Sequence, residues 1–143
     1  MVWGLIGFNY KSELVFFEEN VTADVYQKDT LPHIQSAMRR FPKRWFMHDG
    51  AKAHTAKSTR AALNAANIKV LKWPAHSPHL NPIEKLWNHF HIEISKKRPK
   101  DLDDLKAKAK AVWASFDQAM INRYVLGFDE GIARTITEKG LPW

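Results

Sequence analysis

Two short runs near the start of the chain are rich in β-branched and aromatic residues. VWGLIGF (residues 2–8) and ELVFFEE (residues 13–19) flank the polar segment NYKS, which supplies a turn. Two apolar runs of strand length joined by so short a connection predict a β-hairpin.

The next part of the chain alternates predicted helices with two further strands. Thr22 can cap a helix, and Pro32 predicts a break or a kink within it. The inward positions of this helix are Val25, Tyr26, Ile34, Met38 and Phe41. RWFMHD (residues 44–49) and IKVLKW (residues 68–73) read as strands, and we expect the first to bury residues 45–47. Between them an alanine-rich helix is expected over residues 55–66, ending at Asn67.

The last part of the chain is predicted to be helical, because apolar residues recur there at helical spacing. They are Ile83, Leu86, Phe90 and Ile94, and then Leu102, Leu105, Val112 and Phe116. Strands separated by single helices pair in parallel, so this order predicts an α/β sheet covered by helices. Functional residues of such sheets gather at the carboxyl ends of the parallel strands, and Asp49 stands at one of those ends.

Composition narrows the class of protein. The chain has 143 residues, of which 45% are hydrophobic, and this suits one compact domain with a real core. It contains no cysteine, which excludes disulfides and thiolate metal sites and suggests a reducing compartment. No apolar run approaches the roughly 20 residues that cross a bilayer. We therefore expect a soluble, intracellular protein, located in the nucleus of a eukaryote or in the cytoplasm or nucleoid of a prokaryote.

Charge favours a polyanionic partner. Lysine and arginine number 22 against 15 acidic residues, a formal net charge of +7. No acidic residue lies between Asp49 and Glu84, and a second basic run, KKRPK, occupies residues 96–100. Both segments could be ordinary solvated surface, but lysine and arginine also pair with phosphates and release counterions. The residues expected to contact DNA are Lys52, Lys57, Arg60, Lys97 and Arg98.

Two carboxylates stand out, and each has a structural explanation of its own. Asp49 precedes a glycine, an ordinary turn signal. Asn81 can cap a helix, with Pro82 in its first turn and Glu84 completing a capping box. These explanations do not account for the combination of an acid after a strand, an acid opening a helix, and an acid-free basic segment between them.

The same residues bring a known family into view. HDGAKAHTA (residues 48–56), followed by WPAHSPHLNPIEKLW (residues 73–87), closely resembles the catalytic core of Tc1/mariner transposases, which belong to the DDE transposase and integrase group. The 34 residues between Asp49 and Glu84 match the interval of the DD34E subclass. The resemblance extends over the whole chain.

The resemblance implies a ribonuclease H-like α/β fold, a mixed sheet flanked by helices, and metal-dependent cleavage and transfer of DNA strands. Asp49 and Glu84 would be catalytic acids that hold two Mg²⁺ or Mn²⁺ ions. His54 matches a histidine near the family's site, where it would position other groups. The alternative is that His54 caps the helix it opens.

The resemblance also implies a missing part. The family's first catalytic aspartate lies on a strand ahead of residues 2–4, so residues 1–143 are expected to form a single, N-terminally truncated catalytic domain without that first strand. The exposed flanks would favour a homodimer or another chain that supplies the strand. The sequence leaves open whether the chain is an enzyme or a non-catalytic nucleic-acid-binding remnant.

Overall fold

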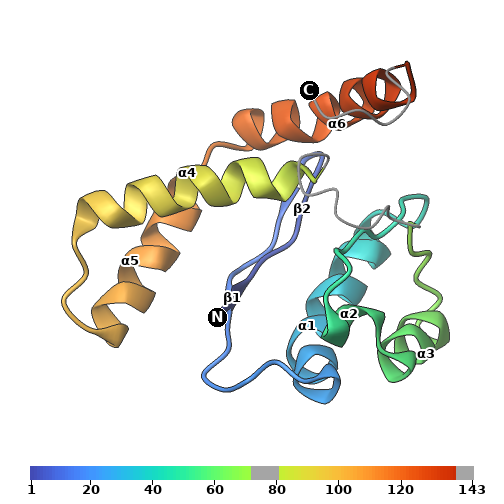
Figure 1. Ribbon diagram of the computed structural model, residues 1–143, viewed down its shortest axis with the longest axis horizontal. Coiled ribbons are helices and arrows are strands. Elements are labelled where there is room, and N and C mark those ends of the chain that lie inside the picture. The colour runs from blue at the N-terminus through green and yellow to red at the C-terminus, as the bar shows by residue number, and fades with distance from the viewer. Residues whose placement is uncertain (72–80, 138–143) are drawn as a thin grey trace. The chain divides into compact units, whose positions relative to one another are not determined.

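The computed structural model describes residues 1–71 and 81–137, with side chains up to residue 127. Figure 1 shows its elements in chain order. The described residues form two compact units, unit 1 with residues 1–5 and 12–71 and unit 2 with residues 6–11 and 81–137. That residues 1–143 act as a single catalytic domain stays a prediction.

The predicted hairpin is present as two short ladders. In unit 1, β1 (Val2–Trp3) pairs antiparallel with β4 (Val15–Phe16), and in unit 2, β2 (Ile6–Gly7) pairs antiparallel with β3 (Tyr10–Lys11). The turn falls on residues 8–9 and not on NYKS, because Asn9 adopts a left-handed conformation with φ of 58°. The side chain of Asn122 holds this turn by accepting the Asn9 N–H at 2.8 Å.

Between the two ladders, the second arm of the hairpin has one residue more than the first arm. Residues 4–5 lie between the ladders on the first arm and residues 12–14 on the second. Ser12, which is buried, bridges the mismatch: its N–H donates to the Leu5 carbonyl, and its Oγ accepts the Leu5 N–H, both at 2.8 Å. A serine hydroxyl therefore replaces a backbone partner at a β-bulge.

The first helix, α1 (Ala23–Arg40), begins as predicted at Thr22, whose Oγ1 accepts the Val25 N–H at 3.3 Å. Of the predicted break or kink at Pro32, the break is wrong, whereas the kink stays a prediction. The helix continues because Pro32 lies on its exposed face, where water can satisfy the carbonyl that loses its partner. The buried face consists of Tyr26, Thr30, Ile34 and Ala37. Val25, Met38 and Phe41, also expected inward, are only half-buried.

The single helix expected over residues 55–66 is two helices, α2 (Lys52–Thr55) and α3 (Lys57–Ala65). They meet at Ala56, whose backbone is extended. The hydroxyls of Thr55 and Thr59 satisfy carbonyls of α2, donating to Ala51 at 3.1 Å and to Ala53 at 2.7 Å. The predicted end is confirmed, since Asn67 takes the left-handed conformation with φ of 55°.

Parallel pairing of the two later strands is confirmed, although it is shorter than predicted. Phe46 pairs with Val70, through hydrogen bonds of 2.8 Å to the Lys69 carbonyl and from the Leu71 N–H. Phe46 is 3% exposed and packs in a core cluster with Ile34, Leu63 and Ile68. The end of IKVLKW, Lys72 and Trp73, lies outside the described residues.

The expectation that residues 45–47 are all buried is wrong. Trp45 is 60% exposed, whereas its neighbour Phe46 is buried. Successive side chains of an extended chain point to opposite faces, so a segment that buries Phe46 must turn Trp45 outward.

Unit 2 contains α4 (Pro82–Lys97), α5 (Leu102–Ser115) and α6 (Gln118–Thr137), which confirms the predicted helices. Its buried apolar residues are Leu86, Phe90, Ala109, Val112, Trp113 and Ile121. Trp87 stacks on Trp113 with ring centroids 5.2 Å apart, so both tryptophans belong to this core. Leu102, at the first position of α5, is 62% exposed, so this member of the apolar repeat does not belong to the core.

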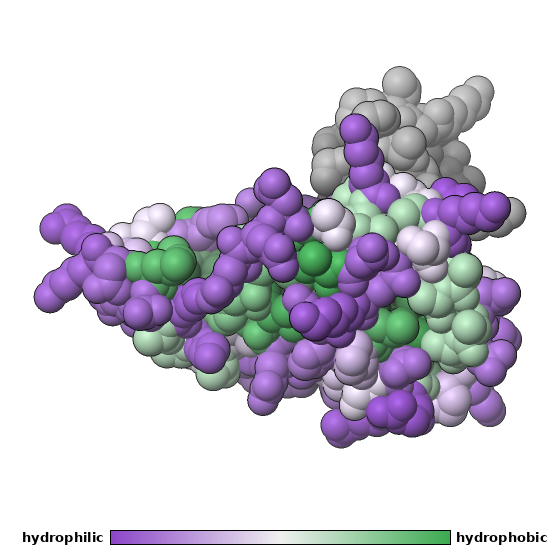
Figure 2. Space-filling view, turned by 90° about the horizontal axis from the view of Figure 1, so that it is seen from below, coloured by the Kyte–Doolittle hydropathy of each residue, from purple (hydrophilic) through white to green (hydrophobic). Residues whose placement is uncertain are grey.

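Polar side chains cover much of the face shown in Figure 2. Within the described residues, no helix combines the length and apolar character needed to cross a membrane.

Lys11 ties the hairpin tip to the end of α5 within unit 2. Its Nζ donates to the carbonyls of Trp113 at 2.6 Å, Phe116 at 2.9 Å and Ala114 at 3.2 Å. Partial burial lowers the pKa of this ammonium. A cation at this position satisfies carbonyls that the helix leaves without partners and complements the helix dipole.

Replacing Lys11 by methionine should destabilise unit 2. The substitution keeps the aliphatic stem and leaves the carbonyls without their charged donor, which costs about 1–3 kcal/mol. Urea unfolding followed by tryptophan fluorescence measures the loss. Lys85→Met, at an exposed position of α4, is the matched control. Equal midpoints for the two variants would show that the Lys11 contacts contribute nothing.

Candidate functional site

Asp49 lies in an exposed turn of unit 1, just after the segment that forms the parallel bridge. It follows Phe46 by three residues, and its side chain is 54% exposed. Its Oδ1 accepts the backbone N–H of Ala51 at 3.0 Å, so the carboxylate closes the turn that leads into α2. The turn that the Asp–Gly pair predicted is therefore present, and the Asp49 carboxylate is accessible in it.

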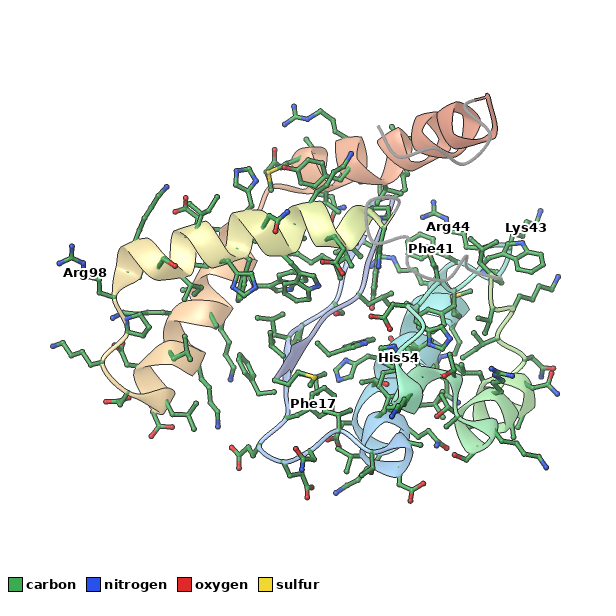
Figure 3. All side chains as sticks on the ribbon, in the orientation of Figure 1. Phe17, Phe41, Lys43, Arg44, His54 and Arg98 are labelled. Carbon is green, nitrogen blue, oxygen red and sulfur yellow. The ribbon has the colours of Figure 1, made fainter. Side chains whose placement is uncertain are left out.

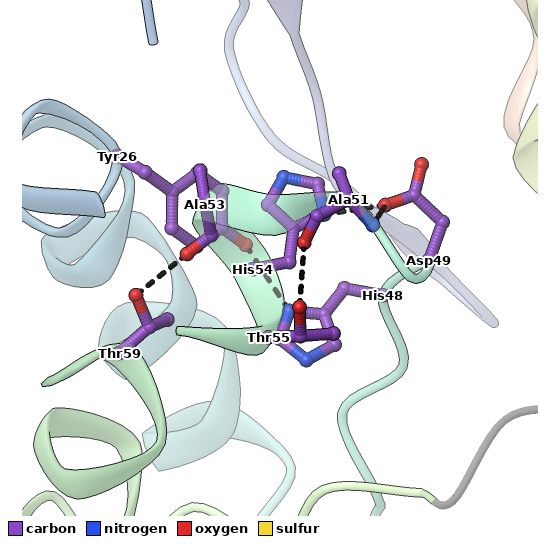
Figure 4. Close-up of polar contacts among 8 residues, drawn as sticks. All are labelled: Tyr26, His48, Asp49, Ala51, Ala53, His54, Thr55 and Thr59. Atoms are coloured by element: carbon purple, nitrogen blue, oxygen red, sulfur yellow. Dashed lines mark hydrogen bonds and ion pairs between the residues drawn. The ribbon is translucent and has the colours of Figure 1, made fainter. Parts of the chain in front are cut away.

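The side chain of His54, on α2, contacts that of Asp49 (Figure 4). Its Nδ1 lies 2.5 Å from Asp49 Oδ1, and the imidazole is 17% exposed. An ionised carboxylate only accepts hydrogen bonds, so in this pair His54 Nδ1 would be the donor. The alternative that His54 caps a helix is wrong, because Ala51 is the N-cap of α2 and the His54 ring bonds to Asp49.

Two aromatic side chains that the sequence analysis did not assign to the site support His54. Its ring centroid lies 4.3 Å from that of Tyr26, and it stacks on His48 with centroids 5.3 Å apart and planes 7° apart. Tyr26 Oη lies 3.5 Å from His48 Nδ1, long for a hydrogen bond. His48 was detectable beside Asp49 in the sequence, whereas Tyr26 arrives from α1 with no local signal.

Burial favours the neutral forms of His48 and Tyr26. It lowers the pKa of His48 to about 4, with a smaller contribution in the same direction from His54. It also raises the pKa of Tyr26 to about 12. Both side chains are therefore neutral at pH 7, and His54 is the group that faces the negative charge of Asp49.

The position of α2 is fixed by polar contacts with its neighbours in unit 1. Gln27 on α1 donates through Nε2 to Ser58 Oγ at 3.1 Å and to Thr59 Oγ1 at 3.3 Å. Thr59, which is 1% exposed, donates in turn to the Ala53 carbonyl of α2 at 2.7 Å (Figure 4). A short helix has little stability of its own, so these bonds keep His54 in place beside Asp49.

Glu84 belongs to unit 2, whereas Asp49 belongs to unit 1. It lies in the first turn of α4, where Asn81 Oδ1 caps the helix by accepting the Ile83 N–H at 3.3 Å. Among the described residues the Glu84 carboxylate accepts no hydrogen bond, so only the Asn81 half of the predicted capping box forms. The negative charge still suits a helix N-terminus.

The residues expected to contact DNA are all exposed. Lys52 lies on α2, and Lys57 and Arg60 lie one turn apart on α3, so unit 1 brings these three onto neighbouring helices. Lys97 ends α4, and Arg98 follows as its left-handed C-cap with φ of 46°, at the helix end labelled in Figure 3. The last two residues belong to unit 2.

The donors around Asp49 suit a hard divalent cation in part. Among the residues that the structure describes, both hydrogen bonds to this carboxylate use Oδ1, so Oδ2 is the oxygen that a cation could take. Mg²⁺ keeps several waters and needs only one or two protein carboxylates. Within residues 1–71 and 81–127, no group of three or more His, Asp or Glu side chains is assembled to hold a metal ion.

Comparison with known proteins gives consistent matches. A family profile described as DDE superfamily endonuclease matches residues 2–106. The Tc3 transposase of Caenorhabditis elegans is 27% identical over 99% of this chain and 44% of its own length. The Tcb2 transposase of Caenorhabditis briggsae is 25% identical over 99% of this chain and 53% of its own length. The chain thus spans about half the length of these relatives.

Solved structures confirm the predicted ribonuclease H-like α/β fold. The Mos1 transposase catalytic domain with raltegravir and Mn superposes with a TM-score of 0.79 at 26% identity, over 94% of this chain and 70% of that one. The mariner Mos1 paired end complex with Mg gives a TM-score of 0.80 at 26% identity, over 94% of this chain and 41% of that one.

Replacing Tyr26 by phenylalanine should change the alkaline stability of unit 1. The pKa of Tyr26 is about 12 in the folded chain and about 10 in the unfolded one, so the unfolded chain loses this proton first. The stability it contributes is complete below about pH 10 and is lost as pH rises toward about 12. Between about pH 9 and 11 the native protein should lose on the order of 1 kcal/mol more than the variant.

Urea unfolding at both pH values measures this difference. The lysines titrate in the same range but do so in both proteins, so the comparison isolates Tyr26. Between about pH 7 and 9 the difference between the two proteins should be constant. Parallel losses above pH 9 would mean that burial does not protect the Tyr26 hydroxyl.

Proposed function

The chain belongs to the DDE superfamily endonucleases, and we propose that it is a Tc1/mariner-type catalytic region that cleaves and transfers DNA strands with divalent metal ions. The observation that supports this most directly is the exposed Asp49 carboxylate, delivered by a parallel strand and held by His54. Because the chain spans about half of its curated relatives, the activity of a whole transposase is part of the proposal.

In this proposal, Asp49 and Glu84 are the metal-binding acids. When bound, divalent ions activate the attacking water or 3′-hydroxyl and stabilise the leaving oxygen. Asp49 would bind through Oδ2, since the Ala51 N–H and His54 both hold Oδ1. Glu84 would bind from the first turn of α4.

His54 is proposed as a positioning residue. Its hydrogen bond fixes the rotation of the Asp49 carboxylate, and carboxylates that bind metals are commonly oriented in this way. The His54 ring lies against the rings of Tyr26 and His48, both of which are neutral at pH 7.

A second candidate function is nucleic-acid binding without cleavage. The net charge of +7 favours it, because phosphate contacts need only exposed lysine and arginine side chains.

The endonuclease proposal also includes a homodimer, or a further chain that completes the sheet, because all catalytic acids must converge for cleavage.

Replacing Asp49 by asparagine should weaken binding of Mn²⁺ at least about tenfold, because an amide lacks the negative charge that attracts the ion. Glu84→Gln should do the same if both acids share a site, and His54→Ala should cost about 10- to 100-fold through loss of orientation. Calorimetric titration measures each affinity. Asp24→Asn, an exposed carboxylate in the first turn of α1, is the control.

The same variants separate the two candidate functions. Nicking of supercoiled plasmid with Mn²⁺ that disappears in Asp49→Asn would support the endonuclease. Plasmid that is bound but left intact, with Mn²⁺ affinity unaltered by Asp49→Asn, would refute it and favour the binding module.

Replacing Lys52, Lys57 and Arg60 together by glutamine should weaken duplex DNA binding and flatten its salt dependence. Each phosphate contact adds about 0.9 to the slope of log affinity against log salt, so the slope should fall by about 2–3. Fluorescence anisotropy at several salt concentrations measures it. A triple variant at Lys28, Lys85 and Arg123, which are all exposed, is the charge-matched control. A slope equal in both variants would exclude a special role for α2 and α3.

A further inference from the structure

A second basic surface lies at the other end of α1 from its acidic first turn. No acidic residue occurs from residue 30 to residue 48, yet this stretch contains RRFPKRW at residues 39–45. Arg39, Arg40, Lys43, Arg44 and Trp45 are all exposed. We call these five residues, together with exposed Lys69, the basic–aromatic patch. It includes none of the residues discussed above as metal-binding or DNA-contacting groups.

We propose that the basic–aromatic patch binds single-stranded nucleic acid, with its cations on the phosphates and one unpaired base stacked on Trp45. This binding requires no metal ion and involves neither Asp49 nor Glu84. It is therefore independent of the endonuclease activity proposed above.

Two of the three guanidinium groups of the patch, those of Arg40 and Arg44, lie over an aromatic ring. Phe41 caps the end of α1, and a tight turn follows in which the Arg44 N–H donates to the Phe41 carbonyl at 3.0 Å. Arg44 lies over the Phe41 ring at 4.5 Å and Arg40 at 5.6 Å. Such cation–π contacts restrict long flexible side chains, so less entropy is lost when they meet phosphates. Figure 3 shows Phe41, Lys43 and Arg44 together, apart from His54 in the same unit.

The backbone pairing of unit 1 fixes Trp45 as the aromatic platform. Phe46 is buried opposite Val70, so the preceding residues of the two segments, Trp45 and Lys69, share the outward face. Lys69 Nζ lies 6.0 Å from the Trp45 ring centroid. The indole nevertheless remains 60% exposed, a large apolar surface for a residue flanked by cations.

Ordinary structural roles explain only part of this patch. The helix dipole favours Arg39 and Arg40 in the last turn of α1. It does not explain Lys43 and Arg44 beyond the helix end, nor an exposed tryptophan next to Lys69. Surfaces that bind single strands commonly combine cations along the phosphate backbone with an exposed aromatic ring.

The exposed indole also decides between single and double strands. In a duplex the bases are stacked on one another, and only the phosphates and groove edges can be reached. An unpaired base offers its face to an aromatic ring, and such stacking is tolerant of sequence. The patch should therefore prefer single strands and show little sequence preference.

The test measures binding of the full chain to a fluorescent 20-nucleotide oligo(dT) and to a duplex of equal length, in EDTA. Trp45→Ala should lower the affinity for the single strand roughly 5- to 100-fold and leave the duplex affinity within about twofold. Trp45→Phe should restore part of the loss, because a smaller ring still stacks. Trp45 is exposed, so the urea midpoint should not change.

Charge variants complete the design. The double variant Arg39→Gln, Lys43→Gln should weaken single-strand binding and lower its salt slope by about 1.4, at about 0.7 per phosphate. Lys28→Gln, at an exposed position early in the same helix, should have no effect. Single-strand affinity unchanged by Trp45→Ala, or equal losses for both ligands, would overturn the proposal. Loss of metal-dependent cleavage would not affect it, since the measurement excludes metal.

Discussion

The short parallel pairing of Phe46 with Val70 determines where the functional residues of unit 1 lie. Two backbone hydrogen bonds of 2.8 Å join the segments, and the Phe46 side chain is buried with Ile34 and Leu63. A shift of one residue would bury Trp45 and expose Phe46, so the register is strongly fixed. Because the register is fixed, the chain leaves the bridge with Asp49 in an exposed turn and Trp45 on the outward face.

The charge distribution places a single acid inside a long basic segment. Between Asp29 and Glu84 the only carboxylate is Asp49. His54 bonds to this carboxylate, whereas the half-buried His48 is neutral at pH 7. In the proposed function, this arrangement lets the surrounding cations attract phosphates while one oriented carboxylate remains available to a divalent ion.

In unit 2, helix capping and core packing fix the helix turn that carries Glu84. Asn81 caps α4, and the helix is anchored by buried Leu86 and Phe90 and by the stacking of Trp87 on Trp113. The first turn of α4 therefore has a fixed position within the unit, and the helix dipole favours a carboxylate there. Within the same unit Lys11 and Asn9 bind the hairpin tip to α5 and α6 through side-chain hydrogen bonds.

The sequence by itself determined the family, the parallel pairing, the helix start at Thr22 and the candidate acids Asp49 and Glu84, because these depend on local patterns and on spacing along the chain. Tertiary structure decided the rest. Pro32 stays inside α1 because it faces solvent, and the helix expected over residues 55–66 divides at Ala56 because threonine hydroxyls satisfy its carbonyls. Tyr26 joins the site, and Trp45 turns outward, only because distant segments pack together, and no local pattern records such contacts.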